Sequence, residues 1–211
     1  MKKIIILTLI CCQACDIPYD GNSIITVKAK IVNGNNEPIV NKEVRIQNSY
    51  GDDNIESNIY KKKSDDSGIV SIKMFRPKGS ANILIDGTDD YLSTEIWGIN
   101  EDYFSGVDWN VGTIYLLKAN ELSLFSIQLN QLNSHKSVTS IQVDAIKHEE
   151  FYYFDSQYNP LYGNFQTVYQ LKKNQNFTLN YSIFNSQTNS TDNFSIPLSI
   201  GTSDLNYTIT F

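Results

Sequence analysis

The sequence predicts an all-β protein built as two tandem antiparallel β-sandwiches, and two observations lead to that prediction. Apolar and polar residues alternate with a period of two through nearly the whole chain, which is the pattern of strands with one buried and one solvated face. Turn-forming residues separate these segments at short intervals, as they do in sandwiches. No long stretch shows the 3.6-residue period of an amphipathic helix.

Three segments in the first half of the chain show the alternation clearly. Their expected inward positions are Ile25, Val27, Ala29 and Ile31, then Val44 and Ile46, then Val70, Ile72 and Met74. The stretches Asn33–Asn36 and Asp65–Gly68 are expected to be hairpin-type turns, because Asn, Asp and Gly favour them. Asp86–Asp90 is expected to be a looser loop.

The second half repeats the pattern. The expected inward positions are Ile141, Val143 and Ala145, then Phe177, Leu179, Tyr181 and Ile183, then Phe194, Ile196, Leu198 and Ile200, and finally Tyr207, Ile209 and Phe211. Asn185–Gln187 is expected to be a looser loop. The apolar phase changes within Leu122–Leu129, which predicts a β-bulge near Leu124. About seven strands are expected here, the size of a second sandwich, with domains at 23–119 and 120–211.

The chain begins with a basic and then an apolar stretch. Lys2 and Lys3 precede an apolar run from Ile4 to Cys12, which is the layout of a secretory signal. The run is shorter than the roughly 20 residues that span a bilayer as a helix.

A cysteine motif follows this leader. Cys12-Gln13-Ala14-Cys15 resembles the lipobox of bacterial lipoproteins, with a small residue before the final cysteine and with Cys12 where the pattern prefers Leu. The resemblance implies a signal peptide of residues 1–14, acyl chains such as palmitate on Cys15, and a tether over 15–22. The alternative is an ordinary signal peptide cleaved near Ala14, with no lipid on Cys15.

The positions of the cysteines and the net charge limit how the domains can be stabilised and which partners they can bind. All three cysteines lie in the leader or at its boundary, so the mature domains must be stable without a disulfide. Removing residues 1–14 deletes two lysines and no acids, and the net charge changes from -6 to -6 - 2 = -8. An acidic chain of this kind excludes nucleic acid as a partner.

The lipobox resemblance implies attachment to a membrane of the cell envelope, and we expect the outer membrane. Whether the domains face the cell surface or the periplasm is left open by the sequence. Asp16 and Asp20 resemble the acidic surface-export signals of some Gram-negative lipoproteins, although a solvated tether explains them equally well.

The first half also resembles a known family. The residues that carry the likeness are Val27–Asn33, Glu37–Ile46, Ser64–Ile72 and the closing Val111–Leu116. They look like the carboxypeptidase regulatory-like family, with Ser64 in place of Thr and Val70 in place of an aromatic residue. The resemblance covers about residues 23–118 and implies a seven-strand transthyretin-like or Ig-like sandwich without catalytic residues. Residues 120–211 resemble no family that we recognise.

Catalytic and metal sites are not expected. His135 and His148 are the only histidines, and no nucleophile elbow, zinc-protease helix or phosphate loop is present. We therefore expect no catalytic residue and no cofactor. His148 beside Glu149 and Glu150 could bind a metal, but it lacks a second spaced histidine, so a solvated loop is favoured.

Acidic loops offer oxygen ligands of the kind that Ca²⁺ takes. They are Asp52-Asp53, Asp65-Asp66, and Asp86 with Asp89-Asp90. Because none has EF-hand spacing and Asp is an ordinary turn former, we expect no metal site.

Aromatic residues in loops are the candidate ligand-binding groups. Trp97, Tyr103 and Trp109 lie in or beside one long connection, and a second group comprises Phe151–Phe154, Tyr158 and Tyr162. Exposed rings of this kind could stack on sugars or anchor a protein. The alternative is that they fasten large loops to the core.

The leading hypothesis is a membrane-anchored, non-enzymatic envelope lipoprotein that serves as a binding or accessory module for a protein or glycan. The alternative is a structural or assembly spacer within an envelope complex. A distant third is an enzyme with an unrecognised site. Burial of both tryptophans would favour the spacer.

Overall fold

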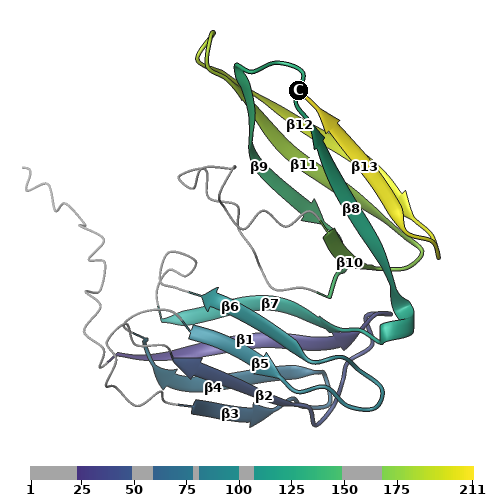
Figure 1. The fold of residues 1–211 in the computed structure, drawn as a ribbon. Coiled ribbons are helices and arrows are strands. Elements are labelled where there is room, and N and C mark those ends of the chain that lie inside the picture. Colours follow the sequence, from purple (N-terminus) through teal and green to yellow (C-terminus); the bar gives the residue numbers. More distant parts are fainter. Residues whose placement is uncertain (1–22, 49–58, 78–80, 100–106, 149–167) are drawn as a thin grey trace, which may run out of the picture.

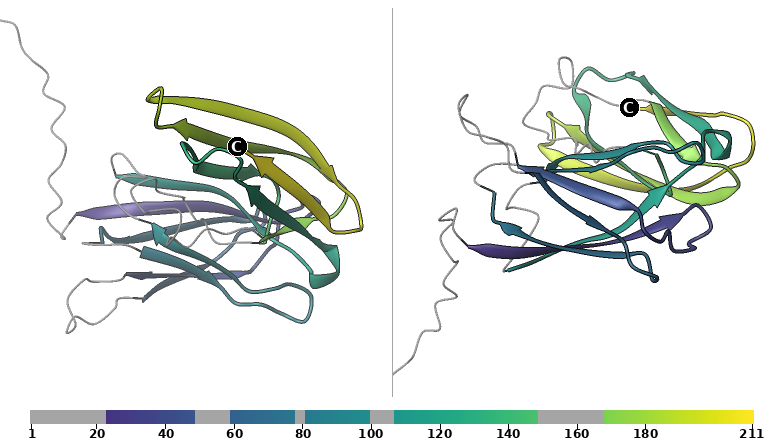
Figure 2. Two further views of the ribbon diagram at one scale, coloured as in Figure 1. Left: turned by 45° about the horizontal axis from the view of Figure 1, so that its top comes forward. Right: turned by 90° about the horizontal axis from the view of Figure 1, so that it is seen from below.

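The computed structural model describes residues 23–48, 59–77, 81–99, 107–148 and 168–211, and in these ranges the protein is all-β. The described residues form thirteen strands in four sheets, with one short 3₁₀ helix, η2 (Ala119–Glu121), between the seventh and eighth strands. The sheets lie face to face in two pairs (Figures 1 and 2). The predicted fold class is therefore confirmed.

The first sandwich consists of β1–β7. One sheet has the order β4-β1-β7 and the other β3-β2-β5-β6. The strands are β1 (Ile24–Asn33), β2 (Glu43–Asn48), β3 (Ile59–Lys63), β4 (Ile69–Phe75), β5 (Ala81–Ile85), β6 (Thr94–Ile99) and β7 (Asp108–Leu116).

Alternate residues of these strands form the first core, as predicted. Along β1, residues Ile25, Val27, Ala29 and Ile31 are all buried. The predicted inward residues of β2 and β4 join the same cluster, and so does Trp109 from β7. Period-two alternation was a reliable signal here because each sheet has one dry and one wet face.

The Asp65–Gly68 turn does not join neighbouring strands of one sheet. Gly68 has a φ of 75°, and the Asp65 carboxylate accepts backbone hydrogen bonds from Ser67 and Ile69, each of 2.9 Å. The turn is tight, as predicted, but β3 and β4 belong to different sheets. The expected hairpin is therefore corrected to a crossing between the two layers.

The Asn33–Glu37 turn is held by its first residue. The Asn33 side-chain oxygen accepts hydrogen bonds from the backbone N–H groups of Asn35 and Glu37 at 2.9 and 3.0 Å, and Asn36 takes the left-handed conformation with φ 65°. Pro38 follows the turn and pairs with Val32 in an antiparallel bridge.

The second sandwich consists of β8–β13, with sheet orders β10-β8-β13 and β12-β11-β9. The strands are β8 (Leu122–Asn130), β9 (Lys136–Asp144), β10 (Val168–Lys172), β11 (Gln175–Asn185), β12 (Ser190–Ile200) and β13 (Leu205–Thr210). Its core includes Phe125, whose ring contacts those of Tyr169 and Phe177 at centroid distances of 6.2 and 5.0 Å.

The predicted β-bulge near Leu124 is wrong. β8 pairs without a register shift with β10 and β13, and Ser123, Phe125 and Ile127 all point inward. Leu124 is exposed on the other face, and its N–H donates to the Asp204 carboxylate at 2.8 Å. A small polar residue occupies an inward position, so hydrophobicity alone misplaced the phase.

The loop expected at Asn185–Gln187 is a tight hairpin turn instead. β11 and β12 pair continuously up to Asn185 opposite Ser190. Asn189 has a φ of 51°, and the Asn185 side chain accepts the N–H of Gln187 at 3.0 Å. Side-chain capping by Asn therefore closes this turn without glycine.

The two sandwiches meet at η2, which lies at the lower right of the second sandwich in Figure 1. Leu117 is fully buried there, and its carbonyl accepts the Leu92 N–H at 2.9 Å. On the other side of η2, Lys173 donates its N–H to the Glu121 carbonyl at 2.8 Å and its ammonium to the Asn120 carbonyl at 2.7 Å. The connection is thus hydrogen-bonded to an inter-strand residue of each sandwich, Leu92 before β6 and Lys173 after β10.

Candidate functional site

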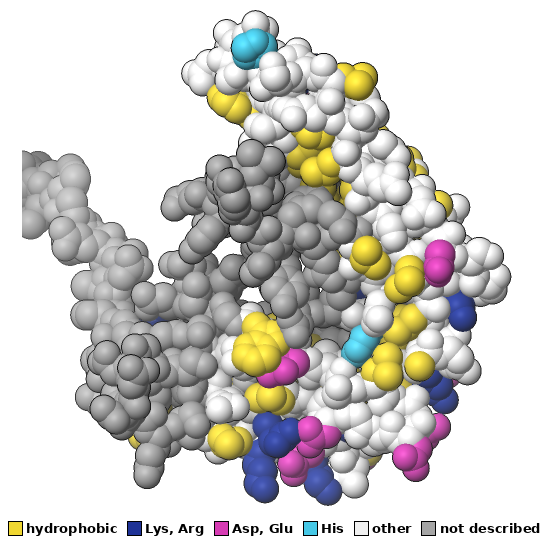
Figure 3. All heavy atoms as spheres, in the orientation of Figure 1, with side chains coloured by type: hydrophobic (Ala, Val, Ile, Leu, Met, Phe, Trp, Pro, Cys, Tyr) yellow, Lys and Arg dark blue, Asp and Glu magenta, His cyan; other side chains and the backbone are white. Residues whose placement is uncertain are grey.

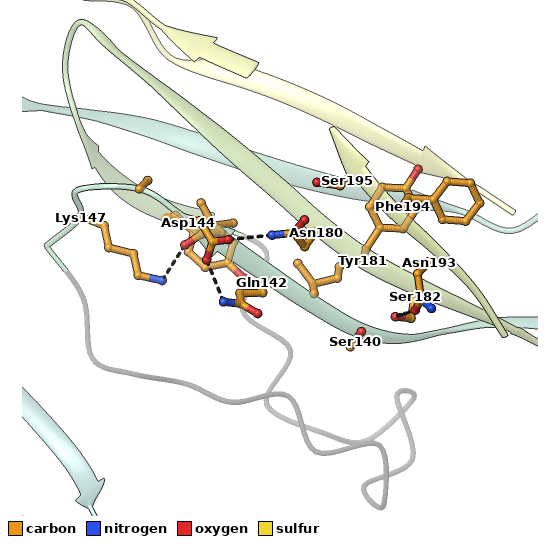
Figure 4. A pocket seen from close by; sticks show the side chains of 14 residues that line it. Ser140, Gln142, Asp144, Lys147, Asn180, Tyr181, Ser182, Asn193, Phe194 and Ser195 are labelled. Atoms are coloured by element: carbon orange, nitrogen blue, oxygen red, sulfur yellow. Dashed lines mark hydrogen bonds between the residues drawn. The ribbon is translucent and has the colours of Figure 1, made fainter. Parts of the chain in front are cut away.

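The second sandwich carries a groove of about 550 Å³ over the sheet β12-β11-β9. Figure 4 shows its lining from close by. We call it the polar groove and define it by seven side chains, Ser140, Gln142, Asp144, Asn180, Ser182, Asn193 and Ser195.

Strand alternation places these side chains on one face. Ile141 and Val143, which alternate with the polar residues of β9, are buried in the core. The pairing register aligns Asn180 with Gln142 and Ser195. It likewise aligns Ser182 with Ser140 and Asn193, so the groove floor consists of two successive polar rows across three strands.

The only carboxylate of this set is already paired with amide groups. Asp144 accepts one hydrogen bond from the Gln142 amide and one from the Asn180 amide, each of 2.7 Å. Ser182 donates to the Asn193 side-chain oxygen at 2.7 Å. The dashed lines in Figure 4 show these bonds. They hold the polar side chains in defined orientations before any ligand arrives.

Lys147 and Tyr169 also line the groove. The Lys147 ammonium lies 5.5 Å from the centre of the Tyr169 ring and 3.3 Å from the Val143 carbonyl, to which it donates. A cation above an aromatic face is stabilised by the charge distribution of the ring. Lys147 therefore has partners within the protein.

Tyr181 and Phe194 also border the groove, but their rings belong to the opposite face. They pair across β11 and β12 in the row that contains the buried Ile141. Their rings stack with centroids 4.8 Å apart. Burial, followed by the neighbouring Tyr207, raises the pKa of the Tyr181 hydroxyl. The stacked rings therefore lie on the core side of the sheet and do not belong to the polar rows.

The predicted ligand-binding aromatic residues are separated by the structure. Trp97 is 47% exposed on β6, whereas Trp109 is 1% exposed within the first core. Trp109 alternates with the exposed Asp108 and Asn110 and so faces inward. Its expected role as a surface ligand-binding group is corrected for that reason. Tyr103 and the group Phe151–Phe154, Tyr158 and Tyr162 lie outside the described residues.

The histidines do not come together. His135 is exposed in a turn, where its backbone N–H donates to the Asn133 side-chain oxygen at 2.9 Å. His148 is half-buried, and burial lowers the pKa of its imidazole. Within the described ranges, no group of three His, Cys, Asp or Glu side chains is close enough to hold a metal ion.

The acidic loops that the structure describes perform local structural roles. Asp65 caps its turn, Asp86 forms an ion pair with Arg45, and Asp90 lies 3.8 Å from the Lys118 ammonium. Asp52, Asp53 and Cys15 lie outside the described residues.

The polar groove was missed from the sequence. The sequence does carry a signal for it, because most outward positions of β9, β11 and β12 are amides and hydroxyls and few are charged. Each strand alone has an ordinary solvated face. Only the pairing register reveals that these faces form one surface.

Comparisons with known proteins give no family. No protein-family model matches the chain, and no curated protein matches it in sequence. A solved Bacillus anthracis protein, TIE, is 11% identical with a TM-score of 0.35, over 90% of this chain and 34% of that chain. The chain also covers only 16% of a 9R-lipoxygenase from Cyanothece, at 13% identity and a TM-score of 0.31.

Two candidate adhesion proteins are matched over most of their length. A candidate adhesin of Bacteroides ovatus is 9% identical with a TM-score of 0.32, over 83% of each chain. A candidate cell adhesion protein of Bacteroides fragilis is 9% identical with a TM-score of 0.23, over 87% of this chain and 92% of that one. Scores this low assign no function to this chain.

None of the helical segments in the described ranges is long and apolar enough to span a bilayer.

Proposed function

We propose that this protein is a bacterial envelope lipoprotein held in the outer membrane by acyl chains on Cys15. The observation that carries the proposal is the Cys12-Gln13-Ala14-Cys15 motif at the end of a basic and then apolar leader. Each buried methylene contributes about 0.8 kcal/mol, and stable anchoring needs more than one chain. Residues 1–14 are the signal peptide of this proposal and 15–22 the tether.

Behind the anchor, the proposal places two domains, 23–119 and 120–211, with the first a carboxypeptidase regulatory-like module. The described strands support this division. The quoted segments of the resemblance fall on β1, β2, β4 and β7, and Gly68 has the positive φ that the resemblance requires. The two core clusters separate at the same point, since the first ends at Leu116 and the second begins at Phe125.

The proposed role is non-enzymatic binding, or accessory binding, of a protein or glycan. Its support is the polar groove, where amide and hydroxyl groups are oriented by mutual hydrogen bonds. Trp97 and Tyr103 remain secondary ligand-binding candidates on the first domain.

The anchor is tested by metabolic labelling with palmitate. The wild-type protein and the matched control Cys11→Ser should incorporate label, and Cys15→Ser should lose it, because only Cys15 would be acylated. Label on Cys15→Ser, or none on the wild type, would overturn the lipoprotein assignment.

Treating intact cells with protease tests whether the domains lie on the cell surface or in the periplasm. Digestion of residues beyond Asn22 without lysis would place the domains on the cell surface. Protection until lysis would place them in the periplasm. Recovery of the protein away from the envelope would contradict membrane anchoring.

A spacer in an envelope complex is the second candidate. The hydrogen-bonded connection at η2 favours it, because it stabilises the protein without offering a ligand surface, although only Trp109 of the two tryptophans is buried. Crosslinking in cells separates the candidates. A spacer should give the same crosslinked partners when the polar groove is altered, for example by Asn193→Ala, whereas a binding module that uses the groove should lose them.

A further inference from the structure

We infer that the polar groove binds a neutral carbohydrate chain. This inference rests on the proposed role as a non-enzymatic binding module and names the ligand class of its groove.

The charge of the groove fits a ligand without charge. Six of its seven defining side chains are amides or hydroxyls. The seventh, Asp144, has each carboxylate oxygen engaged by an amide N–H. Lys147 donates to the Val143 carbonyl. The lining therefore holds one anionic and one cationic side chain, Asp144 and Lys147, and has no excess charge that would favour a phosphate, a carboxylate or a polycation.

Figure 3 shows how charged side chains are distributed over one face of the molecule. Charged side chains gather mainly on the first sandwich and near the connection, while the visible part of the second sandwich shows mostly uncharged side chains.

The hydrogen-bonding groups of the groove match sugar hydroxyls. Amides and hydroxyls both donate and accept, as sugar hydroxyls do. Several of these groups have no partner among the described residues, namely the Ser140 and Ser195 hydroxyls, the Gln142 and Asn180 carbonyl oxygens and the Asn193 amide nitrogen. The groups that do have partners hold the rest in place, which lowers the ordering cost of binding.

The arrangement favours a carbohydrate over a peptide strand. An extended peptide binds by adding to a sheet edge, where backbone groups are unpaired. The floor of the groove is a sheet face, and its central strand β11 has a paired neighbour on each side. Two successive rows present similar small polar side chains, so a polymer with a repeating unit can make similar contacts twice.

Phe184 adds an apolar surface to the same face. It follows Ser182 by two residues on β11 and pairs with Thr191, one row beyond the Ser182–Asn193 pair. Its side chain is half-buried. A partly exposed aromatic ring beside polar groups can stack against the apolar face of a sugar ring.

The test is calorimetric titration of the purified full-length protein with neutral polysaccharides, namely mannan, dextran and galactan, and with anionic polygalacturonate and hyaluronan. We expect saturable binding of at least one neutral polymer and none of the anionic ones. Asn193→Ala and Ser195→Ala should each weaken that binding about tenfold, the effect of one lost hydrogen bond to a ligand. Asn206→Ala, on the outer face of β13 in the opposite sheet, is the matched control and should bind like the wild type.

Both groove variants alter exposed side chains, so their thermal unfolding should match that of the wild type. Binding of anionic polymers alone would overturn the inference. So would neutral-polymer binding that Asn193→Ala and Ser195→Ala leave unchanged, or absence of binding to all five polymers. Capture of a protein partner without any glycan would overturn the inference and leave the proposed binding role intact. Loss of palmitate labelling would overturn the anchor and leave this titration unaffected.

Discussion

In each of the two sandwiches, the first strand lies beside the last one and runs parallel to it. β1 pairs in parallel with β7, and β8 pairs in parallel with β13, while the other named strand pairs are antiparallel. The first pairing contains an irregularity between Lys28 and Ala29, opposite Gly112 with φ 86°. The second is regular over its whole length. The parallel pairing of the first and last strands is thus formed with a bulge in one sandwich and without one in the other.

The two cores differ in how well their margins are covered. Among the described residues, the first cluster includes the fully buried Trp109 and Met74. In the second, the inward row of β12 is only partly covered, with Phe194 at 37% exposure and Ile196 and Leu198 half-buried. Because β12 ends its sheet, its inner face has neighbours on one side only. The second core is therefore less completely covered at β12.

The outermost strands are also protected differently. β3, at one margin of the first sandwich, carries Lys61, Lys62 and Lys63, and β12 carries Pro197. Lysine and proline both discourage further strand pairing. β13 has neither residue. Two sandwiches with similar strand layouts can therefore differ in how their cores are covered and in how their edge strands are protected from further pairing.

The largest expected effect comes from the first core. Trp109→Ala should lower the free energy of unfolding by about 3–5 kcal/mol, because it leaves a large cavity. Trp97→Ala is the matched control and should cost less than about 1 kcal/mol, as expected for a half-exposed site. Urea denaturation followed by circular dichroism measures both. Equal losses would show that burial does not distinguish the two tryptophans.

The next largest effect on stability is expected from a glycine in a turn of the first sandwich, with a turn glycine of the second sandwich as its control. At Gly68 an added Cβ would lie 2.4 Å from the Ile31 carbonyl oxygen, at a φ of 75°. Gly68→Ala should therefore cost about 2–3 kcal/mol. At Gly201 nothing lies within 4 Å of such a Cβ, so Gly201→Ala should change stability by less than about 1 kcal/mol. Thermal melts of the two variants should separate clearly, and similar melting temperatures would refute the assigned turn geometry.

The aromatic cluster of the second core should give a smaller effect. Phe125→Leu keeps an apolar side chain but removes the ring contacts with Tyr169 and Phe177. We expect a loss of about 1–2 kcal/mol, since such ring pairs contribute roughly 0.5–1.5 kcal/mol each beyond the buried area. Ile127→Val, in the same inward row, is a milder control. A loss confined to Ile127→Val would mean that the ring contacts do not stabilise this core.

The smallest effect concerns pH and His148. Burial lowers the pKa of its imidazole below the usual 6.5, so the unfolded chain takes up a proton first as the pH falls. The contribution of neutral, buried His148 is complete above about pH 6.5 and declines as the pH drops below it. Urea midpoints at pH 7.5 and 5.5 should differ less for His148→Gln than for the wild type. The exposed His135→Gln should keep the wild-type difference, and a reduced difference in that variant instead would contradict the assignment.

Local patterns predicted most strands, for a simple reason. The inward residues of β1, β4 and β11 were identified because each strand alternates over most of its length. The prediction went wrong at Leu124, where a buried serine interrupts the apolar row. It also went wrong in expecting an exposed ring at Trp109, which faces inward at the start of β7. Neither error could be corrected without knowing which strands lie opposite.

The sequence by itself determined the all-β class, the spacing of the strands and the cysteine motif of the leader, since these depend on residues close together along the chain. Tertiary structure alone decided that Asp65–Gly68 crosses between sheets, that β1 and β7 run in parallel, and that β9, β11 and β12 together form the polar groove. The physical reason is that sheet order and register depend on contacts between residues distant in sequence. No local alternation of apolar and polar residues records which strands become neighbours.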